Sequence, residues 1–242
     1  MKHKPAASPR AESAVPAAED DSGQTSVEHA TQLLREAIVQ GRFGPGERIK
    51  ITEAAGLLGV GSMPVREALR KLEGEGLVFI TPNRGATVRA VNRQFVEDIY
   101  EVRTTLEVMI MARCVARLTL ARLAALDELV AQHRAAMQAG DVPTMTQISR
   151  TLHTQLFEVA GNVEATRIFQ REWEIILALR GRFGYGQERV TNLQQEFELL
   201  VAALRQGDVP AAERIIRLHN RAGMEDLLHR LESHRPASAS GR

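Results

Sequence analysis

The chain has 242 residues, enough for one large domain or two ordinary ones, and its 44% hydrophobic content supports a packed core. The 31 Lys and Arg residues nearly balance 30 Asp and Glu, so the formal net charge of +1 excludes a polycationic nucleic-acid coat. It does not exclude a DNA-binding surface built from locally placed arginines. The single cysteine, Cys114, excludes an intrachain disulfide and a cysteine-rich zinc site.

The two ends of the chain differ in composition from the rest. Residues 1–24 are rich in Ala, Pro, Ser and Glu without apolar periodicity, so we predict a disordered tail there and a second one at residues 236–242. The N-terminal residues lack the apolar segment of a signal peptide, and no apolar run is long enough to span a bilayer. We therefore expect a cytoplasmic protein that does not contact a membrane.

The N-terminal third of the chain combines helical segments with a β-hairpin. We predict helices ending near Gly41, over Thr52–Leu58 and from Pro64 to Glu73, followed by strands over Leu77–Thr81 and Ala86–Val91. Thr52 is placed as the N-cap of the second helix, and Pro64 lies in the first turn of the third. Three helices followed by a hairpin are typical of a winged helix-turn-helix, which we place at residues 25–91.

The third helix is the expected DNA-reading element, because the second helix of such a pair enters the major groove with its N-terminal residues nearest the bases. This geometry places Ser62, Met63 and Arg66 at the bases, with Arg70 on the same outward face. The other candidate contacts, at the start of the preceding helix and at the wing tip, are Thr52, Arg84 and Gly85. The alternative is that Arg66, Arg70 and Lys71 form an ordinary solvated face.

Everything after Asn92 is predicted to be helical. The helices are expected near 93–117, 120–138, 142–159, 162–182, 188–205 and 209–233. Two junctions are near copies, Ala139–Pro143 and Gln206–Pro210: in each, Gly ends one helix, Asp caps the next and Pro lies in its first turn. We therefore predict a mainly α protein with a helical second domain at residues 92–235.

The helix-turn-helix region contains two specific runs of residues: Gly41-Arg42-Phe43-Gly44-Pro45-Gly46-Glu47-Arg48-Ile49 and Pro64-Val65-Arg66-Glu67-Ala68-Leu69-Arg70-Lys71-Leu72-Glu73-Gly74-Glu75-Gly76-Leu77. Nearly all of residues 28–91 resembles the GntR family of bacterial regulators. This resemblance implies a dimer on a short palindromic operator, usually acting as a repressor. Many members carry Ser-Arg-Thr before Pro-Val-Arg; this chain has Gly61-Ser62-Met63. Base recognition is therefore expected to depend more on Arg66, on Met63 against thymine methyl groups, and on the wing.

The helical region also carries family signatures: Glu101–Glu107, Leu152-His153, Ala160-Gly161-Asn162 and Ala212–His219. These resemble the FCD domain of the FadR-type GntR subfamily. The resemblance implies an antiparallel bundle of six or seven helices around a central pocket that binds carboxylates, such as sugar acids, hydroxy acids or fatty acyl compounds.

Many of these relatives hold a divalent metal such as zinc through one Asp and three His. This chain keeps His153 and His219, but Ser149 stands at the Asp position and Phe197 at that of the middle His. Two imidazoles make an incomplete ligand set, so we expect no metal and no other cofactor. Phe197 would fill the space, and His153 and His219 would hydrogen-bond the effector; they would be metal ligands only if a metal were retained.

Arg103 lies within a largely apolar helix and is a candidate clamp for a ligand carboxylate. The alternative is an ion pair with Glu107 or Glu101. Trp173 and Arg180, seven residues apart on one helix, could line the same pocket, although Trp173 also suits the core. The candidate effector-binding residues are therefore Arg103, Ser149, His153, Phe197 and His219.

The leading hypothesis is a ligand-responsive transcription regulator rather than an enzyme. It would bind operator DNA as a homodimer that represses transcription, and it would respond to an organic acid. One alternative is a metal-dependent enzyme using His153 and His219, which would need a third ligand. The other is a DNA-binding protein whose helical domain only dimerises; a cavity lined by Arg103, His153 and His219 would count against it.

Overall fold

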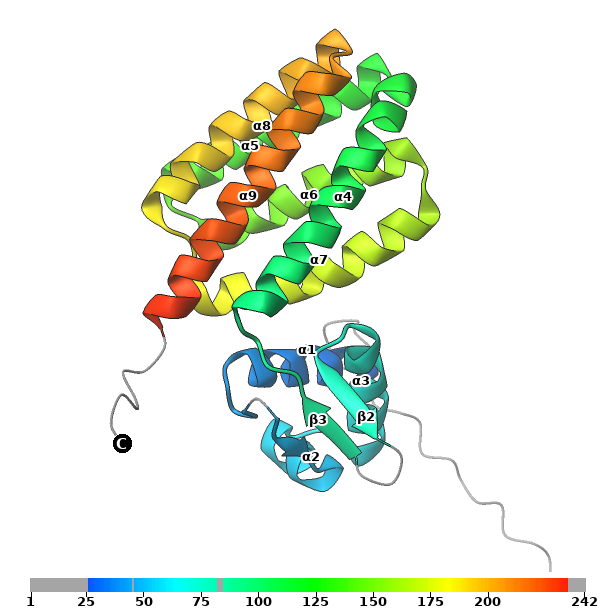
Figure 1. The fold of residues 1–242 in the computed structure, drawn as a ribbon, viewed down its shortest axis with the longest axis vertical. Helices are drawn as coiled ribbons and strands as arrows, with labels where there is room; N and C mark the ends of the chain where they lie inside the picture. Colours follow the sequence, from blue (N-terminus) through cyan, green and yellow to red (C-terminus); the bar gives the residue numbers. More distant parts are fainter. Residues whose placement is uncertain (1–25, 45, 82–84, 235–242) are drawn as a thin grey trace, which may run out of the picture.

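The computed structural model describes residues 26–44, 46–81 and 85–234, which form two parts (Figure 1). A bundle of long helices forms the larger part, and a small domain with short helices and a β-sheet lies at one end of it. The fold is mainly α, as predicted. The tails predicted at residues 1–24 and 236–242 lie outside the described residues.

The small domain is a winged helix-turn-helix. Its elements are α1 (Ser26–Val39), β1 (Arg48–Ile49), α2 (Ile51–Leu58), α3 (Ser62–Gly74), β2 (Val78–Thr81) and β3 (Gly85–Val88). Strand β3 pairs antiparallel with both β1 and β2, so the wing hairpin gains a third strand. The sequence did not predict β1, because two residues are too few for an alternating apolar pattern.

The helix-turn-helix pair is mostly as expected. Val65, Leu69 and Leu72 form the buried stripe of α3 and are at most 4% exposed. Helix α2, however, begins at Ile51, and its N-cap is Lys50, whose side chain makes no capping bond. The prediction that Thr52 caps this helix was therefore wrong: Thr52 lies exposed inside the first turn.

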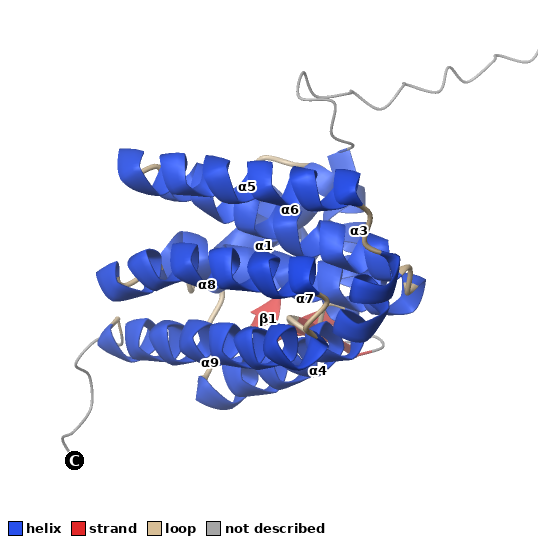
Figure 2. Ribbon diagram, turned by 90° about the horizontal axis from the view of Figure 1, so that it is seen from above, coloured by secondary structure: helices blue, strands red, loops and turns tan. Residues whose placement is uncertain are grey.

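Six helices in the described residues form the bundle: α4 (Arg93–Arg117), α5 (Leu120–Ala139), α6 (Val142–Ala160), α7 (Val163–Phe183), α8 (Gln187–Gln206) and α9 (Val209–Ser233). Figure 2 shows α8 lying between α5 and α9. The two near-copy junctions have the predicted caps, because Asp141 and Asp208 each accept the backbone N–H three residues later, at 3.1 and 2.9 Å. Among the described helices, none has both the length and the apolar composition needed to cross a bilayer.

Helix α7 connects the two parts of the molecule. Its Arg171 Nη1 donates to the carbonyl of Gly74, the last residue of α3, at 2.7 Å. Its Glu174 lies 3.8 Å from Arg35 of α1, which also pairs with Glu75 at 2.7 Å. One hydrophobic cluster runs from the small domain into α4, α7 and α9. The position of the reading helix therefore depends directly on α7.

Candidate functional site

The N-terminal end of α3 presents the predicted reading residues to solvent. Ser62, Met63 and Arg66 are exposed, and Met63 is an apolar side chain at 64% exposure. Within the described part of the chain, Arg66 has no hydrogen-bond or ion-pair partner, whereas Arg70 is bonded to Glu67 Oε1 at 2.9 Å. Arg66 is thus the arginine available for a base edge, and Arg70 is partly neutralised by its neighbour.

The wing contributes one described residue of the predicted contact set. Gly85 is the first residue of β3 and has a φ of +81°, a backbone conformation that residues other than glycine rarely adopt. A Cβ there would lie 3.4 Å from Arg48 Nε, so the backbone of the wing approaches β1 closely. Arg84, predicted at the wing tip, lies outside the described residues.

A small cavity of about 40 Å³ lies inside the bundle, between α4, α6, α7, α8 and α9. It is lined by four of the five predicted effector residues, Arg103, Ser149, His153 and His219, and by Trp173 and Arg180. Phe197 is not part of the lining; its ring packs behind it, 5.8 and 5.4 Å from the rings of His153 and His219. The fold therefore brings together residues from distant parts of the chain, such as Arg103 and Asn220, which are 117 positions apart.

Arg103 is the centre of a buried charged network. Its Nη2 pairs with Glu107 Oε1 at 3.0 Å, its Nε donates to Asn220 Oδ1 at 3.2 Å, and its guanidinium lies 4.4 Å from the Trp173 ring centre. Burial alone would raise the pKa of the Glu107 carboxyl, but Arg103 and His153 hold this pKa below its ordinary value. Of the two alternatives for Arg103, the ion pair with Glu107 is present. Arg103 also lines the cavity, and its role as a clamp for a ligand carboxylate stays a prediction.

Sequence reasoning missed a second arginine, Arg189, because a charged residue in the first turn of a helix resembles a solvated one. Its Nη1 contacts both carboxylate oxygens of Glu196 at 2.7 Å, and its Nη2 donates to the carbonyl of His219 at 3.2 Å. Glu196 Oε2 also lies 2.8 Å from His219 Nδ1. Burial nevertheless lowers the pKa of His219 to about 4, so this imidazole is neutral near pH 7.

Several buried donors around the cavity have no hydrogen-bond acceptor among the residues that the structure describes. They are Arg103 Nη1, Trp173 Nε1 and the ring N–H of His153, neither of whose ring nitrogens has a hydrogen-bond partner. His153 Nδ1 lies 3.2 Å from Glu107 Oε1, close enough for electrostatic attraction, but without hydrogen-bond geometry. An unsatisfied buried polar group costs about 1–3 kcal/mol, so a molecule supplying acceptors here would be favoured.

The cavity does not fit the four-ligand metal site of the family. Ser149 offers a hydroxyl where an Asp carboxylate would be needed, and Phe197 places an apolar ring where an imidazole would bind. No group of three or more His, Cys, Asp or Glu side chains in the described ranges is arranged to hold a metal ion. His153 and His219, with ring centres 5.1 Å apart, remain as two imidazoles.

A carboxyl group on α7 provides a pH-dependent prediction. Glu172 is 5% exposed, and its Oε2 has no hydrogen-bond partner in the described ranges. Burial raises its pKa to about 7 despite the nearby Arg103 and Arg171. In the folded state, Glu172 keeps its proton up to about pH 7, whereas in the unfolded chain it already loses the proton at the ordinary, lower pKa of a Glu side chain. The contribution of Glu172 to stability therefore falls as the pH rises through about 7. Glu172→Gln should stabilise the protein more at about pH 8 than at about pH 5 in urea unfolding. Equal effects at both pH values would contradict this assignment.

The fold and the two sites together define a class of protein: a DNA-binding transcription regulator with a separate helical domain. A model of "Bacterial regulatory proteins, gntR family" matches residues 26–88, and a model of the FCD domain matches residues 98–222, more than half of the chain. The chain belongs to the GntR family and carries an FCD domain.

Similar proteins include other bacterial regulators. The HTH-type transcriptional regulator McbR of Escherichia coli is 26% identical over 72% of this chain and 80% of its own length. The HTH-type transcriptional repressor GlaR of the same organism is 26% identical over 77% of this chain and 88% of its own length. The structure of E. coli McbR/YncC covers 86% of this chain and 99% of that chain at 22% identity, with a TM-score of 0.64, and shows the same fold. These relatives and domains indicate a regulator rather than an enzyme.

Proposed function

We propose that the FCD domain binds a small organic acid in its central cavity, and that binding changes the affinity of the winged helix-turn-helix for operator DNA. The observation that carries this proposal is the set of buried donors without acceptors on Arg103, Trp173 and His153. A carboxylate has two oxygens that accept from guanidinium, indole and imidazole N–H groups. The cavity also argues against a helical domain that only dimerises.

The size of the cavity indicates how the signal would be transmitted. A cavity of about 40 Å³ has room for water molecules only, whereas ligand pockets usually measure about 300–1,000 Å³. Binding of an organic acid would therefore require the surrounding helices to shift. Trp173, on the cavity wall, lies on α7 between Arg171 and Glu174, which contact the DNA-binding domain. A displacement of α7 would therefore move α3. The effector can change DNA affinity only by its differential affinity for the two arrangements.

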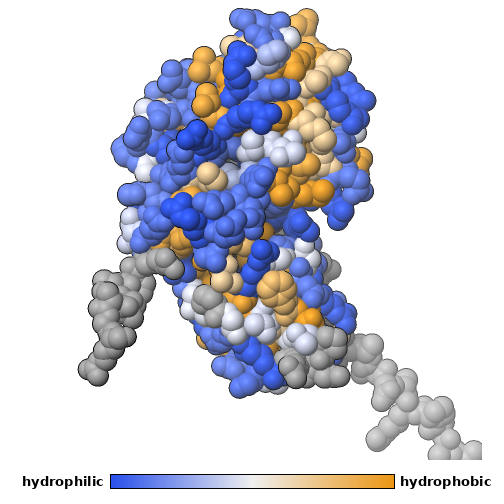
Figure 3. All heavy atoms as spheres, viewed as in Figure 1, coloured by the Kyte–Doolittle hydropathy of each residue, from blue (hydrophilic) through white to orange (hydrophobic). Residues whose placement is uncertain are grey.

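We also propose that the protein acts as a dimeric repressor on a palindromic operator. Val102 and Met109, seven residues apart on α4, and Leu218 on α9 are large apolar side chains at least 45% exposed. Figure 3 shows apolar patches on the face of the bundle where α4 lies. Such a surface suits a subunit interface. Repression is supported by relatives such as GlaR, which is named a repressor.

A thermal-shift screen of purified protein against small carboxylates tests the effector. A ligand at 100 times its Kd should add about 2.7 kcal/mol to the free energy of unfolding. Trp173→Phe keeps an aromatic ring but removes the indole N–H, which has no acceptor among the described residues. It should therefore weaken the binding of a carboxylate hit roughly 10- to 100-fold. Affinity can be measured by calorimetry, with unfolding temperature as the control for folding. Unchanged affinity would place the effector elsewhere.

We propose that this cavity works without a metal ion, since Ser149 and Phe197 replace two ligands of the family set. The same screen, run with a chelator and with added zinc, separates the alternatives. A carboxylate hit that survives the chelator supports a metal-free site. A hit that appears only with zinc would show that His153 and His219 recruit a third ligand from the effector.

A further inference from the structure

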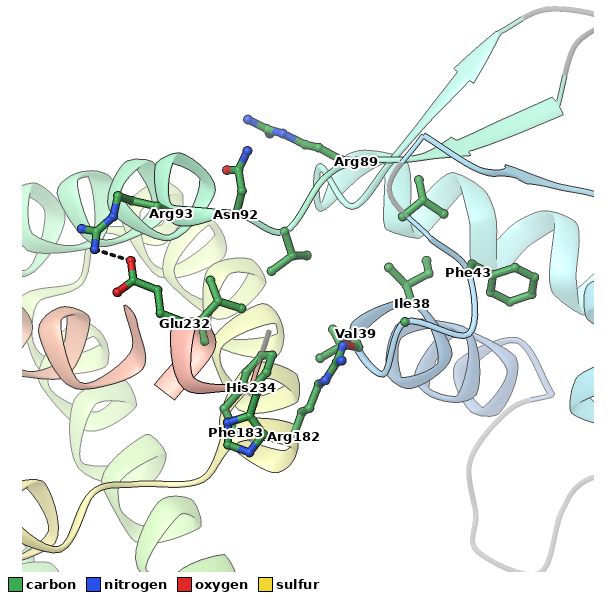
Figure 4. Close-up of a pocket in the computed structure, with 14 residues that line it drawn as sticks. Ile38, Val39, Phe43, Arg89, Asn92, Arg93, Arg182, Phe183, Glu232 and His234 are labelled. Carbon is green, nitrogen blue, oxygen red and sulfur yellow. Dashed lines mark hydrogen bonds and ion pairs between the residues drawn. The ribbon is translucent and has the colours of Figure 1, made fainter. Parts of the chain in front are cut away.

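A second pocket lies at the junction of the two domains, separate from the central cavity (Figure 4). Its volume is about 220 Å³, larger than that of the central cavity. The walls come from the end of α1, strand β3, the linker to α4, and the C-terminal ends of α7 and α9. The apolar lining residues are Ile38, Val39, Phe43, Val88, Val91, Phe183 and Leu231.

The lining is suited to a hydrocarbon group. Ile38, Val39, Phe43, Val88 and Phe183 are each at most 4% exposed and belong to the hydrophobic cluster shared by the two domains. Ligand pockets are commonly apolar, lie at domain interfaces and contain a few placed polar groups. This pocket has all three properties.

The charge of the pocket is positive. Its charged lining residues are Arg89, Arg93, Arg182 and Glu232, with His234 beside them. Glu232 is paired with Arg93 at 2.5 Å. Arg182 donates to the carbonyl of Val39 and stacks on Phe183, but no carboxylate of the described chain lies within ion-pair distance of it. Figure 4 shows Arg182 extending from α7 toward Val39.

We propose that this junction pocket binds a small apolar monocarboxylate, with its carboxylate on Arg182 and its hydrocarbon part against the apolar wall. Arg182 retains donors beyond the one bonded to Val39, so it can hold both groups. Because both domains form the walls, the ligand fits one relative arrangement of the domains. It is therefore a second input to DNA binding, at a site distinct from the central cavity.

Calorimetric titration of the full chain with hexanoate tests the proposal, with hexanamide as the uncharged control. We expect saturable hexanoate binding and roughly tenfold weaker binding of hexanamide, which lacks the charge. Arg182→Gln should weaken hexanoate binding by a similar factor. Val91→Trp, in the linker, should fill the pocket and abolish binding. Trp173→Phe changes a residue of the central cavity and none of the junction pocket, so binding at the junction predicts an unchanged hexanoate affinity.

Each of the following results would overturn the proposal: no saturable hexanoate binding in the millimolar range, wild-type affinity in Val91→Trp, or wild-type affinity in Arg182→Gln. Circular dichroism establishes that each variant is folded. If Val91→Trp fails to fold, Arg182→Gln decides, because this side chain is exposed. Binding lost only in Trp173→Phe would assign hexanoate to the central cavity, which also overturns the proposal.

Discussion

Arg66→Ala is expected to weaken binding to the specific operator by about 100-fold or more, while the protein stays folded. A bidentate arginine–guanine contact contributes about 1–3 kcal/mol of discrimination, and a dimer would lose two such contacts. Arg66 is exposed at the reading end of α3 without a partner in the described chain, so its removal costs no internal contact. An operator selected from random DNA by the wild-type protein provides the probe, and fluorescence anisotropy measures the affinity.

Arg70→Ala is the matched control. It removes the same charge from the same helix, but Arg70 is bonded to Glu67 and lies one turn farther from the reading end. We expect less than about a tenfold loss on the operator, mostly as salt-dependent affinity shared with non-specific DNA. Equal losses for the two variants, or retained sequence preference in Arg66→Ala, would show that α3 does not read bases through Arg66.

Glu107→Gln is expected to lower the free energy of unfolding by about 3–5 kcal/mol, because it leaves a buried arginine without its counter-charge. Glu107 and Arg103 are 1% and 2% exposed, and Glu107 also accepts a hydrogen bond from Asn220 at 2.7 Å. Its lowered pKa has the same physical origin, since the carboxylate is stabilised by Arg103 and His153. Urea unfolding at neutral pH measures the loss.

Two controls separate this effect from a general loss of charge. Glu225→Ala removes a carboxylate from an exposed ion pair with Arg221 and should cost less than about 1 kcal/mol. The double variant Arg103→Met, Glu107→Leu should be more stable than Glu107→Gln, because no buried charge then lacks a partner. A double variant as unstable as the single one would indicate that packing, not charge, holds this region together.

Helix α7 carries residues of both pockets and also contacts the DNA-reading helix α3. Trp173 and Arg180 line the central cavity, Arg182 lines the junction pocket, and Arg171 contacts the end of α3. Ligands at either pocket would therefore act on the same rigid element. This arrangement offers a short physical connection between sensing and DNA binding.

The sequence by itself determined the local structure. The helices of the bundle, the caps at Asp141 and Asp208, and the buried stripe of α3 follow from spacing and capping chemistry within a few residues of each other. The same local reasoning missed β1, because this strand forms only through its hydrogen bonds to β3. It also wrongly predicted Thr52 as the N-cap of α2. A cap depends on the backbone angles at one residue, and composition alone does not fix these.

Only the tertiary structure decided the partners of the charged side chains. Arg103 meets Asn220, 117 positions away, and Arg189 meets His219, 30 positions away. Such contacts depend on how the helices pack, and no pattern within one helix specifies them. The same holds for the junction pocket, whose walls come from both domains. The sequence thus identified the family and most candidate residues, and helix packing decided which donors are left without acceptors.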